Sequence, residues 1–364
     1  MRAEQSMSGV YDGRGTPRIA ATATALPPYT LERAEVKRYI GKVFDLDEHR
    51  LNTMMAVIDN AQVHKRHAIF PVEYIIEPRD LAQKTREYQE HAVRLGRQAA
   101  ECCLARAGMS PADVDMIITL SCTGFMIPSL DAHLINLMGF RSDVRRLPIT
   151  ELGCAAGASA LARAAEFVRA FPDKTVLIVS VELASSTFQR GDLSQANLIS
   201  CVLFGDGAAA AIVTGRPVAG PQILDWQSHT FPNSLDAMGF DLRETGFHIV
   251  LSKDVPQMIR EQIRGIVDAF LLTNDLTLGD IAAHILHPGG QKLLSYLEEQ
   301  LGLCRCDTHV SWDVLGQYGN LSSATIFFIL HEWLTKKTLN AGDYGLAAAF
   351  GPGFGTELLL LRWT

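Results

Sequence analysis

The chain has 364 residues, of which 48% are hydrophobic and 20% are charged, and its formal net charge is −7 at pH 7. This composition is typical of a globular protein with a large core, built as one large unit or two joined halves. The negative charge argues against a nucleic-acid partner, and no apolar run reaches the roughly 18 residues needed to span a bilayer.

The N-terminal part of the chain begins with a polar tail and continues into strand and helix patterns. Residues 1–16 form a loose tail by composition, and MRAEQSMSGVYDGRGTPR lacks the apolar segment of a signal peptide, so we expect a cytoplasmic protein. Arg18–Ala25 (RIAATATA) predicts a strand, and helices are expected across residues 31–61 after Pro27 and Pro28. Residues 87–109 predict an amphipathic helix.

Strands and helices alternate after residue 110. Residues 113–120 (DVDMIITL) and 175–182 (TVLIVSVE) are short apolar runs typical of strands buried on both faces. Helices are expected over residues 129–139 and after Cys154, and a strand of small residues follows FGDG at residue 204. This alternation predicts an α/β fold with a mostly parallel sheet covered on both sides.

Two pairs of segments resemble each other in the same order along the chain. SPADVDMIITLSCTG at 110–124 resembles TLGDIAAHILHPGG at 277–290, and FGDGAAAAIVTG at 204–215 resembles FGPGFGTELLLL at 350–361. The pattern indicates an internal duplication with a boundary near residues 215–221, which gives halves of 17–217 and 218–364. Because clefts form beyond the carboxyl ends of strands, we expect the site where the halves meet.

The stretch LPITELGCAAGASALARAAEFVRAF at 147–171 contains a single cysteine, Cys154, before an alanine-rich helix. The helix is apolar nearly all round, which predicts that it is buried. A thiol at a helix start lies near unpaired amide groups and the positive end of the dipole, so we expect it to ionise more easily than usual. Taken alone, Cys154 could equally be a small buried residue.

His287 and Asn320 are the two other candidates for chemistry. His287 ends an apolar strand before the sharp turn Pro288-Gly289-Gly290, whereas His284 should point to the opposite face and be structural. Asn320 opens GNLSSAT before an apolar helix, where asparagine is often only a cap. Together, cysteine, histidine and asparagine can provide a nucleophile, a proton-handling group and an amide donor for acyl transfer through a thioester.

The seven cysteines are spread through a long chain, which favours a reducing compartment over a disulfide framework. Cys304 and Cys306, with Asp307 and His309 nearby, could be considered as a metal site. Zinc sites usually space cysteine pairs by two to four residues and need a second pair, so we expect no metal here.

The chain resembles the type III polyketide synthases, the chalcone synthase-like branch of the thiolase superfamily, from about residue 18 to the C-terminus. The motifs that carry this resemblance are ELGCAAG at Cys154, VLFGDGAAA at Phe204, LRETG and KDVP at 242–256, HPGG at His287, GNLSSAT at Asn320 and FGPG at 350–353. SCTGF at 121–125 is similar to bacterial members. The resemblance implies a homodimer of five-layered αβαβα subunits, each built from two duplicated halves.

The resemblance also implies roles for these residues. Cys154 would be acylated by a starter acyl-CoA, and His287 would support its thiolate. His287 and Asn320 would hold the thioester carbonyl of malonyl-CoA as it loses CO₂, without a metal or redox cofactor. The pocket and gate positions implied by the family are Phe204, Cys122, Thr123, Thr187, Ile249, Ser322, Gly351, Pro352 and Gly353.

The residues that bind the CoA phosphates in plant members are not matched. Thr53, Ala56 and Asn60 occupy those places. Arg50, Lys65 and Arg66 lie nearby in sequence. We expect Lys292, after the HPGG turn, to bind CoA.

Small and apolar residues at the pocket positions favour a fatty acyl-CoA starter extended with malonyl units and closed to an alkylpyrone or alkylresorcinol. The alternatives within this chemistry are a malonyl-only synthase that forms a polyhydroxynaphthalene and a ketoacyl synthase III-like condensing enzyme. Alternatives from other classes are a cysteine protease or amidase and a non-catalytic scaffold that keeps the fold.

Overall fold

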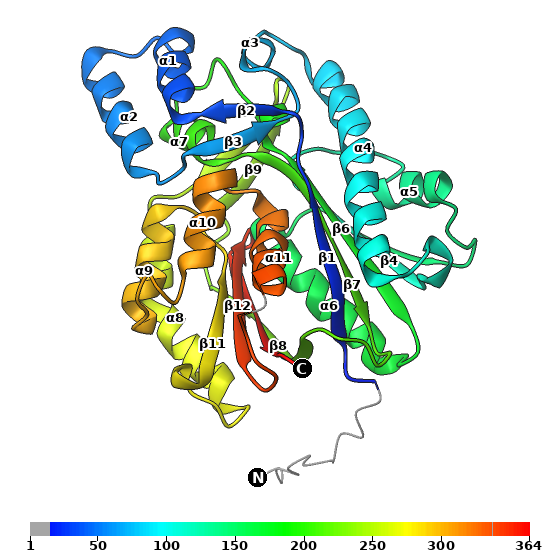
Figure 1. Cartoon of the computed structure of the whole chain (residues 1–364). Helices are drawn as coiled ribbons and strands as arrows, with labels where there is room; N and C mark the ends of the chain where they lie inside the picture. The colour runs from blue at the N-terminus through cyan, green and yellow to red at the C-terminus, as the bar shows by residue number, and fades with distance from the viewer. Residues whose placement is uncertain (1–14, 337) are drawn as a thin grey trace.

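Two half-sheets form the centre of the molecule, which the computed structural model describes over residues 15–336 and 338–364. The strand orders are β5-β4-β6-β7-β1 and β8-β13-β12-β11, and in the described residues they join into one nine-stranded sheet where β1 meets β8 (Figure 1). The strands are β1 (Arg18–Ala25), β4 (Met116–Leu120), β5 (Arg145–Ile149), β6 (Thr175–Leu183), β7 (Asp206–Thr214), β8 (Gln222–Thr230), β11 (Ile281–Leu286), β12 (Tyr344–Gly351) and β13 (Gly355–Arg362).

The two half-sheets repeat one topology, which confirms the duplication predicted from the sequence. β4 is parallel to β6, β6 antiparallel to β7 and β7 antiparallel to β1, and β11, β12, β13 and β8 have the same relationships. A capping box precedes β4 at Ser110 and Asp113, and another precedes β11 at Thr277 and Asp280. The similar segments therefore build equivalent elements. The predicted tail falls outside the described residues apart from Gly15 and Thr16.

The prediction of a mostly parallel sheet is wrong. β4 is parallel to β5 and β6, and β11 is parallel to β12, but the remaining pairs are antiparallel. The reason lies in the connections. After β6 the chain passes through residues 184–205 and re-enters the sheet from the end at which it left, so β7 must run the opposite way. β12 and β13 are joined by a short turn at Pro352, which also requires an antiparallel pair.

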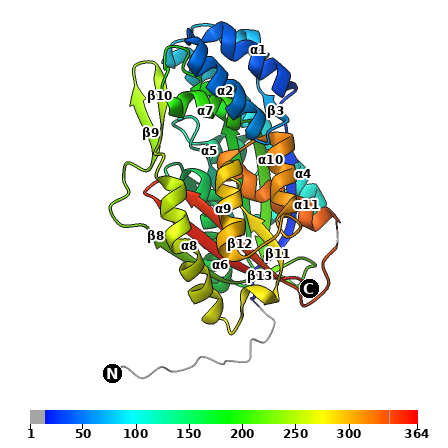
Figure 2. The ribbon, with the colours of Figure 1, turned by 90° about the vertical axis from the view of Figure 1, so that its left-hand side faces the viewer.

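Helices form three layers around the half-sheets, which gives the predicted αβαβα order. α4 (Leu81–Ala107) and α5 (Leu130–Met138) cover the outer face of the first half-sheet. α6 (Ala156–Ala170) and α11 (Thr325–Lys336) lie between the half-sheets, with α10 (His309–Tyr318) beside α11. α8 (Val255–Leu272) and α9 (Gln291–Leu301) cover the outer face of the second half-sheet, as Figure 2 shows.

The central layer is built from the small, apolar residues noted in the sequence. α6 is buried along most of its length. Alternate residues of β6 point to opposite faces of the sheet, one face toward α6 and the other toward α4. Val176 and Ile178 face α6, whereas Leu177 and Val179 face α4, as expected for a strand buried on both faces. The predicted buried helix after Cys154 is therefore confirmed.

A cap of short elements lies at the end of the half-sheets where β6 finishes (Figure 1). Its helices share an apolar cluster that includes Ile40, Phe44, Ile58 and Leu198. The cap elements are β2 (Tyr29–Glu32), α1 (Arg33–Val43), α2 (Glu48–Asn60), β3 (Lys65–Ala68), α3 (Val72–Ile75) and α7 (Gln195–Leu203), and the hairpin of β9 (Met238–Arg243) and β10 (Gly246–Leu251) stands beside it.

The predicted helices and strands are present, with differences at their ends. β1 has the predicted bounds, and α1 and α2 lie within the region expected to be helical. α4 begins six residues earlier than predicted, at Leu81, because the Asp80 carboxylate accepts a hydrogen bond from the Gln83 amide and caps the helix there. Within the described residues, none of the helices combines the length and the apolar character that a membrane crossing requires.

Candidate active site

Cys154 lies in a short 3-10 turn, Gly153–Ala155, that leads directly into α6. The side chain is 8% exposed and faces a cavity rather than the solvent. Its Sγ atom lies 3.5 Å from Oγ of Ser322 and 4.0 Å from Oδ1 of Asn320. The turn thus presents the thiol to the loop that precedes α11.

The expectation that the helix start makes Cys154 easier to ionise is not met. Burial raises the pKa of the thiol to about 11, and the nearby Glu182 carboxylate adds to this rise, although the Ser322 and Asn320 side chains lower the pKa. The cost of removing a thiolate from water outweighs the hydrogen bonds that favour the thiolate here. At neutral pH Cys154 is therefore a thiol, and any reaction that needs the thiolate also needs a base to take its proton.

His287 follows the last residue of β11, and its backbone amide donates to the Ala348 carbonyl of β12 over 2.8 Å. The imidazole is 1% exposed, and neither ring nitrogen has a partner within the described part of the chain. Burial lowers the pKa of His287 to about 4, so the ring is neutral near pH 7. His287 and Cys154 line the same cavity, where a neutral imidazole is available to accept the proton of a neutral thiol, and the resulting ion pair has the same net charge.

Asn320 lies in the loop between α10 and α11, and its backbone pairs with the Phe204 segment. The Asn320 amide donates to Leu203, and the Gly205 amide donates to Asn320. The side-chain Oδ1 accepts hydrogen bonds from the Ser322 amide at 2.7 Å and the Thr325 hydroxyl at 3.4 Å. These contacts hold the oxygen end and leave the amide nitrogen as the end that can donate into the cavity.

One cavity of about 600 Å³ brings most of the predicted site residues together. It contains Cys154, His287 and Asn320, which come from three different segments. The predicted pocket and gate residues that also line it are Phe204, Cys122, Thr123, Thr187, Ile249, Ser322, Pro352 and Gly353. Most of its remaining wall is apolar, with residues from α1, α3 and the β9–β10 hairpin. The cavity lies between the cap and the half-sheets, where the two halves meet.

Two predicted residues do not line the cavity. Gly351 packs against the turn that carries Cys154, where a Cβ atom would come within 2.3 Å of the Leu152 carbonyl oxygen. Its role is close packing behind the thiol. Lys292 is exposed on the first turn of α9, whereas its neighbours Gly289 and Leu293 reach the cavity.

Phe204 is held by Arg66, a contact that the sequence does not reveal. Arg66 is 5% exposed, and its Nη1 donates to the Phe204 carbonyl over 2.9 Å. Burial lowers the pKa of Arg66 to about 10, so the guanidinium remains charged at neutral pH. Arg66 therefore holds the backbone at Phe204 from inside the fold.

The sequence analysis missed Glu182, a buried carboxylate beside the site. It accepts hydrogen bonds from the Cys122 amide at 3.1 Å and the Thr123 hydroxyl at 2.8 Å, and also from the Ser323 hydroxyl. Burial raises the pKa of Glu182, and these donors oppose the rise. An acidic residue at the end of the otherwise apolar run TVLIVSVE was the available signal, because a buried charge needs partners.

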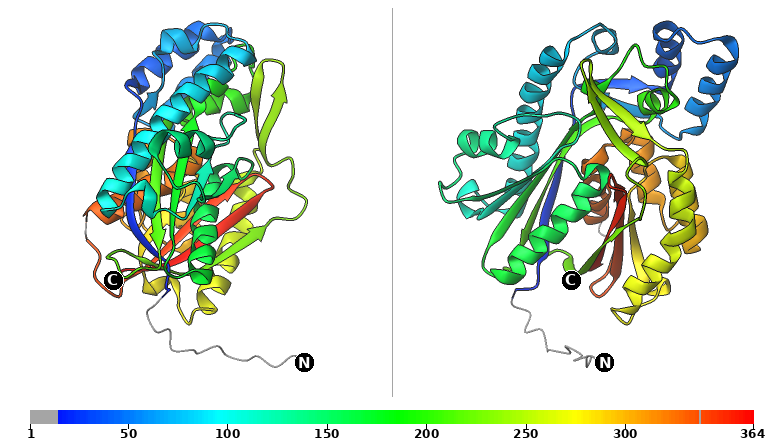
Figure 3. Two further views of the ribbon diagram at one scale, coloured as in Figure 1. Left: turned by 90° about the vertical axis from the view of Figure 1, so that its right-hand side faces the viewer. Right: turned by 180° about the vertical axis from the view of Figure 1, so that it is seen from behind.

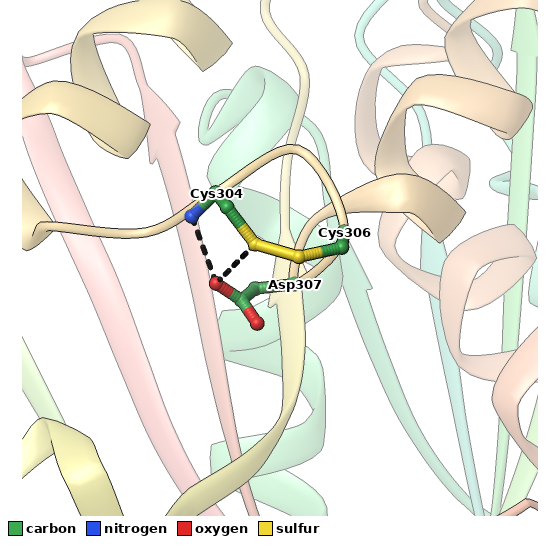
Figure 4. Close-up of side chains that lie close together, drawn as sticks. All are labelled: Cys304, Cys306 and Asp307. Carbon is green, nitrogen blue, oxygen red and sulfur yellow. Dashed lines mark hydrogen bonds between the residues drawn. A yellow bond between two sulfur atoms is a disulfide. The ribbon is translucent and has the colours of Figure 1, made fainter.

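Cys304 and Cys306 form a disulfide in the loop between α9 and α10 (Figure 4). The Asp307 carboxylate accepts a hydrogen bond from the Cys304 amide over 2.8 Å. Because the two sulfur atoms are bonded to each other, they are not free as metal ligands. The expectation of cysteines without disulfides is therefore wrong at this pair, whereas the other cysteines in the described residues are free.

Comparison with known proteins gives the same family over nearly the whole chain. The N-terminal domain of chalcone and stilbene synthases matches residues 4–217, and the C-terminal domain of the same family matches residues 223–364. The chain is 35% identical to 1,3,6,8-tetrahydroxynaphthalene synthase from Streptomyces peucetius subsp. caesius, covering 96% of this chain and 94% of that protein. It is 34% identical to phloroglucinol synthase from Pseudomonas fluorescens, covering 87% and 91%, respectively.

The fold agrees with these sequence relationships. The crystal structure of 1,3,6,8-tetrahydroxynaphthalene synthase from Streptomyces coelicolor, a bacterial type III polyketide synthase, superposes with a TM-score of 0.92 at 32% identity, covering 95% of this chain and 99% of that chain. The chain is therefore a member of the chalcone and stilbene synthase family, a type III polyketide synthase and acyl-CoA-condensing acyltransferase.

Proposed function

We propose that Cys154 is the nucleophile and that His287 is the base that activates it. The imidazole takes the thiol proton, the sulfur attacks the thioester carbonyl of a starter acyl-CoA, and the carbon–sulfur bond to CoA breaks. The proton on His287 then passes to the departing CoA thiolate. The acyl group is left on Cys154, and the imidazole is again neutral. The neutral thiol and imidazole in one cavity support this role.

His287 and Asn320 serve the next step in this proposal. Malonyl-CoA loses CO₂, and the electron pair of the broken bond forms an enolate on the thioester. Two hydrogen-bond donors aimed at the thioester oxygen stabilise this charge as it develops. The enolate carbon attacks the acyl group on Cys154, and the sulfur leaves. The lengthened chain returns to Cys154 for another round, so the chemistry that we propose needs no metal or redox cofactor.

The proposed starter is a fatty acyl-CoA, and the proposed product is an alkylpyrone or alkylresorcinol. The observation that carries this choice is the apolar wall of the cavity, which extends from the site to the cap. Its apolar residues include Val36, Ile40, Val43, Phe44, Val72, Ile75, Met238, Phe240, Phe247, Ile249 and Leu251. Burying one methylene group of an alkyl chain is worth about 0.8 kcal/mol.

A malonyl-only synthase that forms a polyhydroxynaphthalene is the second candidate. It is supported by the similarity to tetrahydroxynaphthalene synthases and by Cys122, whose sulfur reaches the cavity and lies 3.2 Å from Oγ of Ser322. Either product is compatible with the same nucleophile and donors. Membership of the family removes the cysteine protease from consideration.

We also propose a cytoplasmic homodimer that takes its substrates as CoA thioesters. Two features support association of copies. Among the residues that the structure describes, β5 is an edge strand, and an unpaired strand edge is a template for another chain. In the loop after β4, Phe125 is 56% exposed and Ile127 is 80% exposed. Lys292 remains our proposed contact for the CoA phosphates, because it is exposed just beyond the His287 turn.

Product mass spectrometry tests the proposal. Purified protein is incubated with malonyl-CoA alone and with acyl-CoAs of increasing chain length, beside Cys154→Ala. We expect Cys154-dependent products heavier than the starter by acetate units. We also expect kcat/KM to rise about fourfold for each added methylene until the cavity is filled. An aromatic product from malonyl-CoA alone would replace the fatty starter with the second candidate. No product with any CoA thioester would refute the proposal.

A further inference from the structure

The β9–β10 hairpin forms one wall of the cavity, yet its strands pair only with each other. Within the described residues it is a separate two-stranded sheet, and Figures 2 and 3 show it standing apart from the nine-stranded sheet. Met238 and Phe240 on β9 and Phe247, Ile249 and Leu251 on β10 line the cavity. Because an isolated hairpin is marginally stable in water, contacts outside it must fix its position.

The turn of this hairpin is held by two side chains from the first half of the molecule. Nζ of Lys84, on α4, and Nε2 of Gln189, in the loop after β6, each donate to the Thr245 carbonyl over 3.2 Å. Gln189 also donates to the Phe247 carbonyl over 3.1 Å, and Lys84 donates to the Phe188 carbonyl over 2.8 Å. The two side chains thus link the turn to α4 and to the loop after β6.

A second link lies one residue beyond Phe247. Nδ1 of His248 lies 3.1 Å from the Asp192 carboxylate, and its Nε2 lies 2.7 Å from the Thr245 hydroxyl. The loop that carries Gln189 and Asp192 is itself anchored, because the Asn197 side chain on α7 donates to both of their carbonyls. The hairpin turn is therefore attached to a loop that α7 anchors.

Burial and fit show that these contacts form a built arrangement. Lys84 is 8% exposed and Gln189 is 5% exposed. Burial lowers the pKa of Lys84 to about 8. The Lys84 ammonium donates to backbone carbonyl groups. The nearby Glu87 carboxylate pairs instead with Arg79, at 2.6 Å. Gly246 has φ +117°, and a Cβ atom there would lie 3.2 Å from Nε2 of Gln189. The turn thus packs closely on the Gln189 side chain, in a backbone conformation that favours glycine.

We propose that Lys84, Gln189 and the Asp192–His248 pair, here called the hairpin clamp, position the β10 wall and so decide which starter chain and how many extensions the cavity accepts. These residues are positioning residues, because they do not line the cavity around Cys154. The claim that the clamp sets starter and extension selectivity rests on the function proposed above. The claim that the clamp holds the hairpin in place does not, because it concerns only where the hairpin lies.

The experiment compares Lys84→Met and Gln189→Leu with the wild type. Both variants keep the volume and remove the donors. Lys336→Met is the matched control, since Lys336 is a lysine on α11 whose contacts, Asp313 and Glu332, lie away from the cavity. Amide hydrogen exchange of residues 238–251 measures, without any substrate, how firmly the hairpin is held in place. Product mass spectrometry with a series of acyl-CoA starters measures selectivity, and CO₂ release from malonyl-CoA measures the donor site alone.

We expect amide exchange in residues 238–251 to become at least tenfold faster in Lys84→Met and Gln189→Leu and to stay unchanged in Lys336→Met. The ratio of products with different numbers of acetate units should change at least fivefold, while CO₂ release stays within twofold of the wild type. If Lys84→Met does not fold, Gln189→Leu decides. Unchanged exchange in both variants overturns the clamp. Faster exchange with unchanged product ratios overturns its role in selectivity. A wild type that forms no product refutes the proposed function, and the exchange result still decides the clamp.

Discussion

Oγ of Ser322 lies 3.5 Å from Sγ of Cys154 and 3.2 Å from Sγ of Cys122, so one hydroxyl contacts two of the thiols that line the cavity. This hydroxyl lowers the pKa of Cys154 against the rise that burial causes. Ser322 belongs to the Asn320 loop, whereas Cys154 precedes α6, so the reactivity of the thiol depends on how these two segments pack.

Replacing Ser322 with alanine should therefore slow the reaction of Cys154 with iodoacetamide. A hydrogen bond of about 1 kcal/mol to the thiolate corresponds to about a fivefold lower rate at pH 8. The modified fraction of the Cys154 peptide is followed by mass spectrometry. Cys122→Ala is the control, because it removes the other neighbour of the hydroxyl and should leave the rate within twofold. An unchanged rate in Ser322→Ala would show that the hydroxyl does not tune the thiol.

Asn320→Asp should block CO₂ release from malonyl-CoA while the protein stays folded. The aspartate keeps an acceptor for the Ser322 amide and loses the amide donor. Removing one donor to a developing oxyanion costs about 100-fold to 1,000-fold in rate. The release of ¹⁴CO₂ from labelled malonyl-CoA at pH 8 measures the loss, and the melting temperature checks the fold. Release above one tenth of the wild-type rate would contradict the proposed role.

Gly157→Ala should destabilise the protein and lower its activity together. Gly157 lies on the first turn of α6, and an added Cβ atom would approach the Ser323 carbonyl oxygen to 2.4 Å. Overpacking of this kind typically costs about 1–3 kcal/mol. Urea unfolding measures the change, and Gly265→Ala on α8, where the added atom meets open space, is the control. Equal stability of the two variants would mean that α6 can shift away from the Asn320 loop at no cost.

The buried His287 should make the protein less stable in acid. Its pKa is about 4 in the folded protein and 6.5 as the ordinary value, because burial disfavours the charged ring. Between these pH values the unfolded chain binds more protons, so the free energy of unfolding falls as the pH falls from about 6.5 to about 4. His287 accounts for a decrease of about 2 kcal/mol in the free energy of unfolding between pH 7 and pH 5.

In His287→Gln this loss should disappear, so the fall in stability between pH 7 and pH 5 should be about 2 kcal/mol smaller than in the wild type. Chemical denaturation at both pH values measures the difference. His49→Gln, at an exposed histidine on α2, serves as the control and should follow the wild type. A variant with the same pH dependence as the wild type would mean that His287 is not buried as a neutral ring.

Arg66→Met should weaken the binding of CoA substrates through Phe204. The change removes the donor to the Phe204 carbonyl and leaves a buried acceptor unpaired, at a cost of about 1–3 kcal/mol in stability. We expect a higher KM for malonyl-CoA and a smaller change in kcat. The neighbouring Lys65→Met should leave KM within twofold. Equal KM values in both variants would show that Arg66 does not support the gate.

Much of the fold and the members of the site could be predicted from the sequence because they depend on local patterns. The strand at Arg18–Ala25, the helix after Cys154 and the capping boxes before β4 and β11 each follow from residues close together in the chain. The duplication was readable for the same reason. Resemblance of motifs to a family then grouped Cys154, His287 and Asn320, which line one cavity in the structure.

The tertiary structure decided the direction of the strands, the protonation states of Cys154 and His287, and the contacts that hold the cavity walls. β7 runs antiparallel to β6 because the chain returns from the cap, which no local pattern encodes. Burial by distant segments makes Cys154 a thiol, against the expectation from the helix start, and it makes His287 a neutral ring. Glu182 and the hairpin clamp likewise bind residues far away in sequence. Desolvation and hydrogen bonding depend on all atoms packed around a group, and only the folded chain brings those atoms together.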